Sequence, residues 1–209
     1  MTASTKGPGR PVDPARRERI LEAALTCMAE EQNFNMQQVA ARAGVAKGTL
    51  YRHFPNADAL LLAVLERHHS QLAGQVDASA QNLQQVREHL LNLGLQLVDF
   101  FSSEAGIRLL RAVYAYGASH PQHGEMIFRD GPMAFVRRAA EHLQQAADLG
   151  AITLDEPLLR AEQLVGMWKG SLMSGLLMNG CHAPTIAQRE ERVVSATDLL
   201  LNALACQKT

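Results

Sequence analysis

Residues 39–55 read VAARAGVAKGTLYRHFP, a stretch that predicts two short helices joined by a sharp turn. The first helix is indicated by apolar residues at positions i, i+3, i+4 and i+7, namely Met36, Val39, Ala40 and Ala43. Gly44 is expected to end it, because glycine adopts the positive φ that a turn between helices commonly requires. The second helix runs from Lys47 to His53 and is closed by Phe54-Pro55.

The second helix has only seven residues, so we expect it to present side chains rather than to stabilise the fold. Val45 and Leu50 are expected to pack the pair onto the preceding helix. The residues left for the exposed face are Lys47, Thr49, Tyr51, Arg52 and His53. In a helix-turn-helix, the second helix places such polar side chains in the major groove of DNA.

The charge of the chain is unevenly distributed. Residues 1–55 contain eight Lys and Arg against five Asp and Glu, a net charge of +3, whereas residues 56–209 contain 12 and 16, a net charge of −4. A basic head on an acidic body suits a protein whose head alone meets a polyanion.

The rest of the chain also has helical periodicity and lacks the alternation of apolar and polar residues that is typical of strands. A helix is expected from Pro14, with Asp13 as its N-cap, and another from Asn56. Five more are expected near residues 82–102, 104–118, 122–149, 155–179 and 186–206. The fold class predicted is therefore all-α, with about nine helices: a three-helix DNA-binding domain and a larger helical domain.

Composition excludes several classes of protein. The chain has 209 residues, 47% hydrophobic and 20% charged, which is ordinary for a globular protein. Its longest apolar run, Ala59–Leu65, is far shorter than the roughly 20 residues of a membrane span, and the start resembles no secretory signal. Three cysteines do not make a disulfide framework, so a reduced, cytoplasmic protein is expected. Sequence motifs of hydrolases and nucleotide-binding enzymes are absent, so neither catalysis nor a cofactor is expected.

Residues 39–55 and 59–64 resemble the DNA-binding signature of the TetR repressor family. More loosely, three segments of the body are similar to the AefR-like effector domains of that family: 108–117, 126–135 and 158–177. The resemblance implies a basic arm at 1–13, a helix-turn-helix domain at 14–56, and an effector-binding and dimerisation domain at 57–209. It further implies a repressor that binds a palindromic operator as a homodimer and is released by a lipophilic small molecule.

The resemblance also implies roles for individual residues. Asn35, Gln37 and Gln38 would contact phosphates at the start of the first motif helix. Lys47, Gly48 and Thr49 would face base edges, and Tyr51 the DNA backbone; Arg52 and His53 lie on the same helix. Arg42 is expected either at a phosphate or in an intramolecular ion pair. Arg10 would reach the minor groove, or else belong to a solubilising tail. Ala57 stands where many family members have a phosphate-binding lysine, so one backbone contact is expected to be missing.

Two sites are expected in the body. The last two helices, rich in small and apolar residues, would form the homodimer interface, although plain monomer core explains the same pattern. An apolar pocket with a few polar side chains would suit a lipophilic effector. Its candidate lining is Phe100, Phe101, Tyr114, Tyr116, His120, Met126, Phe128, Phe135, Met167, Trp168 and Met173.

Other functions remain as alternatives. An all-α small-molecule carrier could share the body but would not need residues 47–53, and an architectural DNA binder would lack sequence preference. Redox sensing would depend on Cys181 or Cys206. A metal site at His120 and His123 is disfavoured, because Pro121 between them argues for a loop.

Overall fold

The computed structural model describes residues 14–30, 35–73 and 79–205 of the chain. Expectations for Arg10, Asp13 and Cys206 therefore lie outside the described residues. The described part confirms the all-α class, since its only β pairing is an isolated bridge between Ile152 and Ala205. The chain divides into two compact units, residues 1–64 and 65–209, which we call the head and the body.

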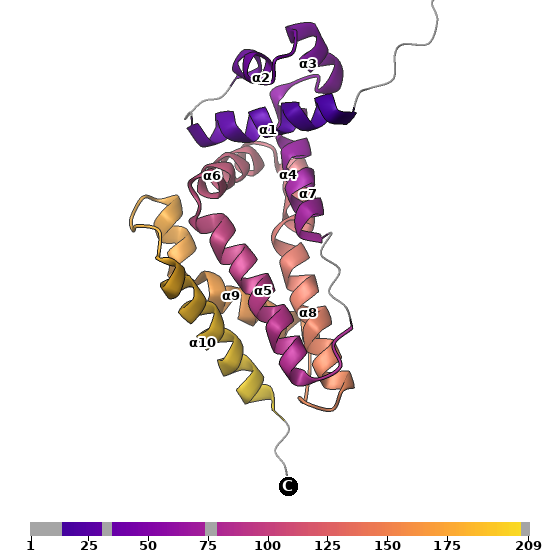
Figure 1. Cartoon of the computed structure of the whole chain (residues 1–209), viewed down its shortest axis with the longest axis vertical. Helices are drawn as coiled ribbons and strands as arrows, with labels where there is room; N and C mark the ends of the chain where they lie inside the picture. The colour runs from indigo at the N-terminus through magenta and orange to yellow at the C-terminus, as the bar shows by residue number, and fades with distance from the viewer. Residues whose placement is uncertain (1–13, 31–34, 74–78, 206–209) are drawn as a thin grey trace, which may run out of the picture. The chain divides into compact units, whose positions relative to one another are not determined.

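The helices of the described residues follow the periodic segments of the sequence (Figure 1). They are α1 (Pro14–Glu30), α2 (Met36–Arg42), α3 (Lys47–His53), α4 (Ala57–Ala73), α5 (Leu83–Ser102), α6 (Glu104–Ser119), α7 (Pro121–Asp130), α8 (Pro132–Asp148), α9 (Pro157–Leu177) and α10 (Ile186–Leu204). Asn82 and Ser103 cap α5 and α6, each accepting a hydrogen bond from a backbone N–H of the first turn at 3.0 Å.

One expected helix is wrong. The segment 122–149 forms two helices, α7 and α8, because Gly131 has non-helical torsions (φ −97°, ψ −99°) and Pro132 is the first residue of α8. Proline has no N–H to donate to the preceding turn, so it begins a helix more readily than it continues one. The apolar periodicity runs through this break and conceals it.

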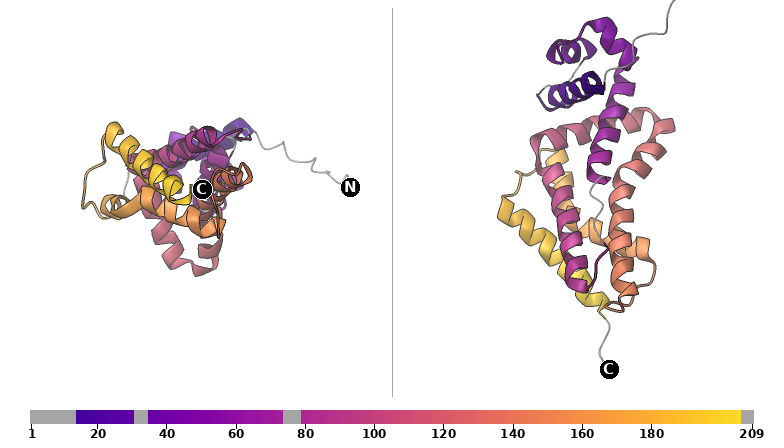
Figure 2. Two further views of the ribbon diagram at one scale, coloured as in Figure 1. Left: turned by 90° about the horizontal axis from the view of Figure 1, so that it is seen from below. Right: turned by 45° about the vertical axis from the view of Figure 1, so that its right-hand side comes forward.

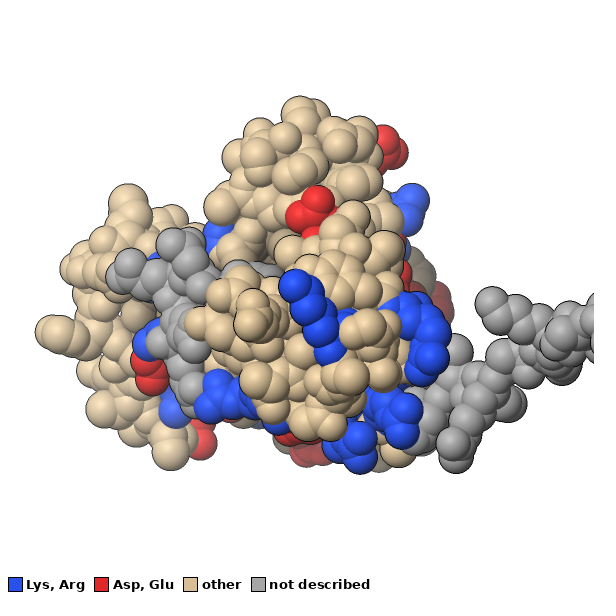
Figure 3. Space-filling model, turned by 90° about the horizontal axis from the view of Figure 1, so that it is seen from above, with Lys and Arg blue, Asp and Glu red and all other residues tan. Residues whose placement is uncertain are grey.

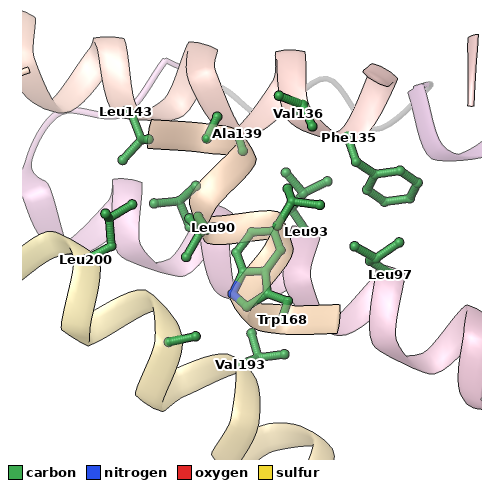
Figure 4. Close-up of a cluster of buried hydrophobic side chains, with 14 of the residues drawn as sticks. Leu90, Leu93, Leu97, Phe135, Val136, Ala139, Leu143, Trp168, Val193 and Leu200 are labelled. Carbon is green, nitrogen blue, oxygen red and sulfur yellow. The ribbon is translucent and has the colours of Figure 1, made fainter. Parts of the chain in front are cut away.

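The core of the body lies among α5, α8, α9 and α10, with α5 between α8 and α10 in both Figure 1 and the right-hand view of Figure 2. Trp168 of α9 is fully buried at its centre (Figure 4). The indole Nε1–H donates to Thr197 Oγ1 at 3.1 Å, and the threonine hydroxyl donates to the carbonyl of Val193 at 2.7 Å. The polar edge of the indole is thereby satisfied without water, as a buried tryptophan requires.

Two ion pairs fix α10 along α5. Arg87 holds Asp198 through two hydrogen bonds of 2.6 and 2.9 Å, and Arg189 holds Asp99 at 2.6 Å. Residue numbers rise along α5 as they fall along α10, so the helices run antiparallel. The hydrogen bonds from Arg87 lower the pKa of Asp198, which keeps this pair ionised as the pH falls. Partly exposed pairs add little stability, so their main effect is on register.

Gly94 permits the close approach of α5 to its neighbours. A Cβ atom at this position would lie 2.6 Å from Val193 Cγ1 and 2.8 Å from Trp168 Cε2. Gly94→Ala should therefore lower the free energy of unfolding of the body by about 1–3 kcal/mol, through overpacking. Urea unfolding followed by circular dichroism measures the change.

Gly117→Ala on α6 is the matched control, since a Cβ there would meet nothing within 4 Å. This variant should gain up to about 1 kcal/mol from helix propensity. Equal stability of the two variants would contradict the close packing at Gly94.

Candidate nucleic-acid interface

The first helix of the motif, α2, starts with a complete capping box. Asn35 Oδ1 accepts hydrogen bonds from the N–H groups of Gln37 and Gln38, at 3.0 Å each. In return, the Asn35 N–H donates to Gln38 Oε1 at 2.9 Å. Both residues of the box are among those expected at phosphates, so part of their hydrogen-bonding capacity holds the helix start.

The turn between α2 and α3 depends on Gly44, which has a φ of +63°. Its N–H donates to the carbonyl of Ala41, and the Val45 N–H donates to that of Ala40. These bonds satisfy the last carbonyls of α2 and redirect the chain within three residues. The positive φ expected of this glycine is confirmed.

The second helix of the motif, α3, is attached to the head through its inner face. Leu50 is fully buried and Phe54, just after the helix, is 3% exposed. The guanidinium of Arg17 on α1 lies 5.5 Å from the centroid of the Phe54 ring, a cation–π contact that ties the end of α3 to α1. A seven-residue helix is thus held in place by one buried leucine and a buried aromatic residue at its end.

Of the five residues expected on the outer face of α3, three are exposed and two are half-buried. Lys47, Gly48 and Arg52 are exposed, Tyr51 is 41% exposed, and Thr49 and His53 are half-buried. Lys47 Nζ lies 5.8 Å from the Tyr51 ring centroid, so these two side chains share one part of the surface. Asn35, Gln37 and Arg42 are exposed on the head as well, and Gln38 is half-buried.

Several Lys and Arg side chains lie close together on the face shown in Figure 3. Residues 16–19 of α1 contain three arginines, for which the sequence pattern predicts no individual role. Arg17 supports α3, as described above, and Arg19 is exposed. The run of arginines in a basic head was the signal that could have pointed to them.

The candidate pocket residues of the body fall into three groups. Phe101, Tyr116, Phe135 and Trp168 are buried. Phe100, His120, Met126, Met167 and Met173 are half-buried. Tyr114 and Phe128 are 50% and 57% exposed.

The phenol of Tyr116 lies 2.5 Å from His123 Nδ1, and its ring stacks on that of His120 with centroids 4.2 Å apart. Within the described residues, no three His, Cys, Asp or Glu side chains are grouped so as to hold a metal ion. Cys27 is buried and Cys181 is exposed.

An apolar groove of about 490 Å³ lies between α9 and α10. Its lining consists of Gln163, Gly166 and Met167 from α9, and Leu199, Leu200 and Ala203 from α10. Leu199, in the C-terminal third of α10, is 63% exposed. None of the described helices is long and apolar enough to cross a membrane.

Comparison with known families assigns both units. The model described as bacterial regulatory proteins, tetR family, matches residues 20–64. The model described as AefR-like transcriptional repressor, C-terminal domain, matches residues 88–206, more than half of the chain. The chain belongs to the TetR family. The expected resemblance, including its AefR-like part, is confirmed, and TetR-family proteins of this kind are transcriptional regulators rather than enzymes.

Individual relatives agree with this TetR assignment. The HTH-type transcriptional repressor KstR of Mycobacterium tuberculosis is 42% identical over 67 residues, which cover 31% of this chain and only 30% of KstR. A TetR transcriptional regulator from Agrobacterium tumefaciens superposes with a TM-score of 0.73 at 21% identity, over 93% of this chain and 96% of that chain. SmeT in complex with triclosan superposes with a TM-score of 0.67 at 22% identity, over 93% of each chain. SmeT is the repressor of the Stenotrophomonas maltophilia multidrug efflux pump SmeDEF. At these identities the two structures show a shared fold.

Substitution of alanine for two glycines of the head should have opposite effects on the stability of that unit. Gly44→Ala places a Cβ at a φ of +63° and should destabilise the head by about 1–2 kcal/mol. Gly48→Ala adds a Cβ that meets nothing within 4 Å and should stabilise α3 by up to about 1 kcal/mol. Amide hydrogen exchange of α1 to α3 measures both. A destabilising Gly48→Ala would mean that the fold, and not the outer surface, requires this glycine.

Proposed function

We propose that this TetR-family chain is a ligand-responsive repressor that binds a palindromic operator as a homodimer and is released by a lipophilic small molecule. The observation that carries the proposal is the orientation of α3. Its apolar Leu50 is fully buried in the head, while Lys47, Gly48 and Tyr51 are exposed on the outer side. A helix presented in this way can enter the major groove.

The proposed contacts follow from position along α3. Lys47, Gly48 and Thr49 form its first turn and would meet base edges, because the N-terminal residues of a recognition helix reach deepest into the groove. Tyr51, Arg52 and His53 would meet the DNA backbone. Gln37, Arg42 and the capping residues Asn35 and Gln38 would approach phosphates from α2. Arg10 would add a minor-groove contact from the arm.

Gly48 supports this reading in particular. Within a helix, glycine is less favourable than alanine by about 1 kcal/mol. A Cβ at this position would meet no atom of the protein within 4 Å, so packing does not require its absence. A smooth surface at the start of α3 allows the backbone to approach a base edge closely.

The α9–α10 groove supports dimerisation. Two protomers with one recognition helix each would double the number of base contacts and match a palindrome. The groove is apolar and contains exposed leucine, alanine and glycine, which permit close packing of helices from a second copy. The dimer is therefore proposed to form through α9 and α10.

The lipophilic effector is supported by the composition of the body and by a relative. Outside the α9–α10 groove, the half-buried members of the candidate lining include Phe100, Met126 and Met173, and the flexible side chain of methionine adapts to apolar ligands of different shape. SmeT, which shares the fold, binds triclosan in its solved complex. Along the chain, α4 connects the head to the body, so we propose that effector binding acts on the spacing of the two recognition helices through α4.

Selection of binding sites from random duplex DNA tests the repressor function. The wild-type chain should enrich a palindrome. The double variant Tyr51→Ala with Lys47→Ala should bind this palindrome roughly ten- to hundredfold more weakly, because a base contact and a backbone contact are both lost. Arg129→Ala, which removes an exposed positive charge from the body, is the control and should bind as the wild type does. Enrichment of the same palindrome by the double variant would refute the assignment of α3.

The oligomeric state tests the role of the groove. Leu199→Glu should convert a dimer into a monomer at micromolar concentration, because it would bury an unpaired carboxylate between two copies. Leu149→Glu alters another exposed leucine, at the end of α8, and should leave the dimer intact. Analytical ultracentrifugation distinguishes the states. A monomeric wild type, or a dimeric Leu199→Glu variant, would exclude this interface.

A further inference from the structure

Helix α9 is bent at Gly170. The torsions of this residue, φ +48° and ψ −149°, belong to a region that essentially only glycine adopts. The regular hydrogen bonding of a helix cannot pass through such a residue, so α9 consists of two segments, 157–169 and 171–177. The guanidinium of Arg192 on α10 lies against the bend, since a Cβ on Gly170 would be 2.8 Å from Arg192 Nη1.

The two segments of α9 contribute to the same hydrophobic core but differ in how deeply they are buried. The segment 157–169 contributes Ala161, Leu164 and Trp168 to the core, all fully buried. In the segment 171–177 the most buried side chain is Leu176, while Ser171 and Ser174 are exposed. Burial therefore immobilises the first segment far more strongly than the second.

Arg111 of α6 fixes the end of the second segment. Its Nη2 donates to the carbonyl of Leu176 at 2.6 Å and to Asn179 Oδ1 at 2.7 Å, and its Nε donates to the carbonyl of Leu177 at 2.9 Å. The same helix end forms a Schellman motif, with Asn179 at a φ of +56° and the Gly180 N–H donating to the carbonyl of Gly175 at 2.7 Å.

The contact from Arg111 is stronger than an ordinary polar contact. A guanidinium that donates to the last carbonyls of a helix makes charge-assisted hydrogen bonds and also interacts favourably with the negative end of the helix dipole. The planar fork of Arg111 donates to two successive carbonyls from separate nitrogens, a fixed geometry that the compact ammonium group of lysine lacks. Arg111 thus adds charge-assisted hydrogen bonds to the apolar packing between α6 and the end of α9.

We propose that residues 171–177 move together with α6, turning about Gly170, while residues 157–169 stay in the core. Arg111 is the positioning residue of this device. What the movement serves rests on the proposed function: α6 carries Tyr114 and Tyr116 of the candidate pocket, and residues 171–177 carry Met173. A shift of α6 caused by an effector would carry residues 171–177 with it through Arg111, while the groove residues of α9 stay in the fixed segment.

Amide hydrogen exchange of the full-length chain tests the attachment without DNA or effector. Arg111→Ala should accelerate exchange of residues 171–180 by roughly ten- to hundredfold, since several hydrogen bonds to a charged group are lost, and leave residues 157–169 unchanged. Arg108→Ala is the matched control, because this arginine of α6 pairs with Glu104 of its own helix. Equal acceleration in both segments of α9, or none in either, would overturn the proposal.

A double-mutant cycle tests whether α6 and the second segment move together. Ser103→Ala removes the N-cap of α6 and should loosen that helix. With Arg111 present, exchange of residues 171–180 should rise severalfold along with that of α6; with Arg111→Ala in the background, Ser103→Ala should cause no further change in residues 171–180. Additive effects of the two substitutions would refute the coupling. A chain that passes this test yet enriches no operator would retain the device while losing the proposed repressor function.

Discussion

Burial of Leu50 is the interaction on which the DNA-binding surface depends. A helix of seven residues is too short to persist in water by its own hydrogen bonds, so α3 exists because its inner face is part of the head. The same burial fixes which way the helix faces. Once Leu50 points inward, the 3.6-residue period directs Gly48 to the opposite side of the helix and Tyr51 to its flank. Lys47 is exposed at the first position of the helix. The turn at Gly44, the capping box at Asn35 and the contact of Arg17 with Phe54 all serve to hold this one helix in register.

The head could be predicted from sequence because its signals are local. Gly44, the caps and the closing proline each act within a few residues, and the structure confirms the expected helices α2 and α3. The break between α7 and α8 also has a local signal, the dipeptide Gly131-Pro132, but the apolar periodicity continues across it and masks it. Periodicity reports which side of a helix is apolar, and it is insensitive to a change of axis that preserves that side.

The lining of the candidate pocket could not be predicted from periodicity. Periodicity identifies Trp168 and Tyr114 alike as members of a body helix, yet the first is fully buried against protein and the second is half exposed. Whether an apolar side chain meets protein, ligand or solvent depends on neighbours distant in the sequence. The same holds for the ion pair of Arg87 with Asp198 and for the hydrogen bonds from Arg111 to the end of α9, since neither leaves a pattern in the residues around it. The bend at Gly170 was hidden as well, because glycine in a run of small residues does not reveal the sign of its φ.

The position of the single tryptophan allows the two units to be followed separately by spectroscopy. The chain has one Trp, and it lies in the core of the body, hydrogen-bonded to Thr197. Indole emission shifts to longer wavelength when water reaches the ring, so intrinsic fluorescence reports on the contact of α9 with α10 and is silent about the head. Far-ultraviolet circular dichroism, in contrast, sums the helices of both units. A difference between the two signals during unfolding would therefore distinguish unfolding of the head from unfolding of the body, with no label added to the chain.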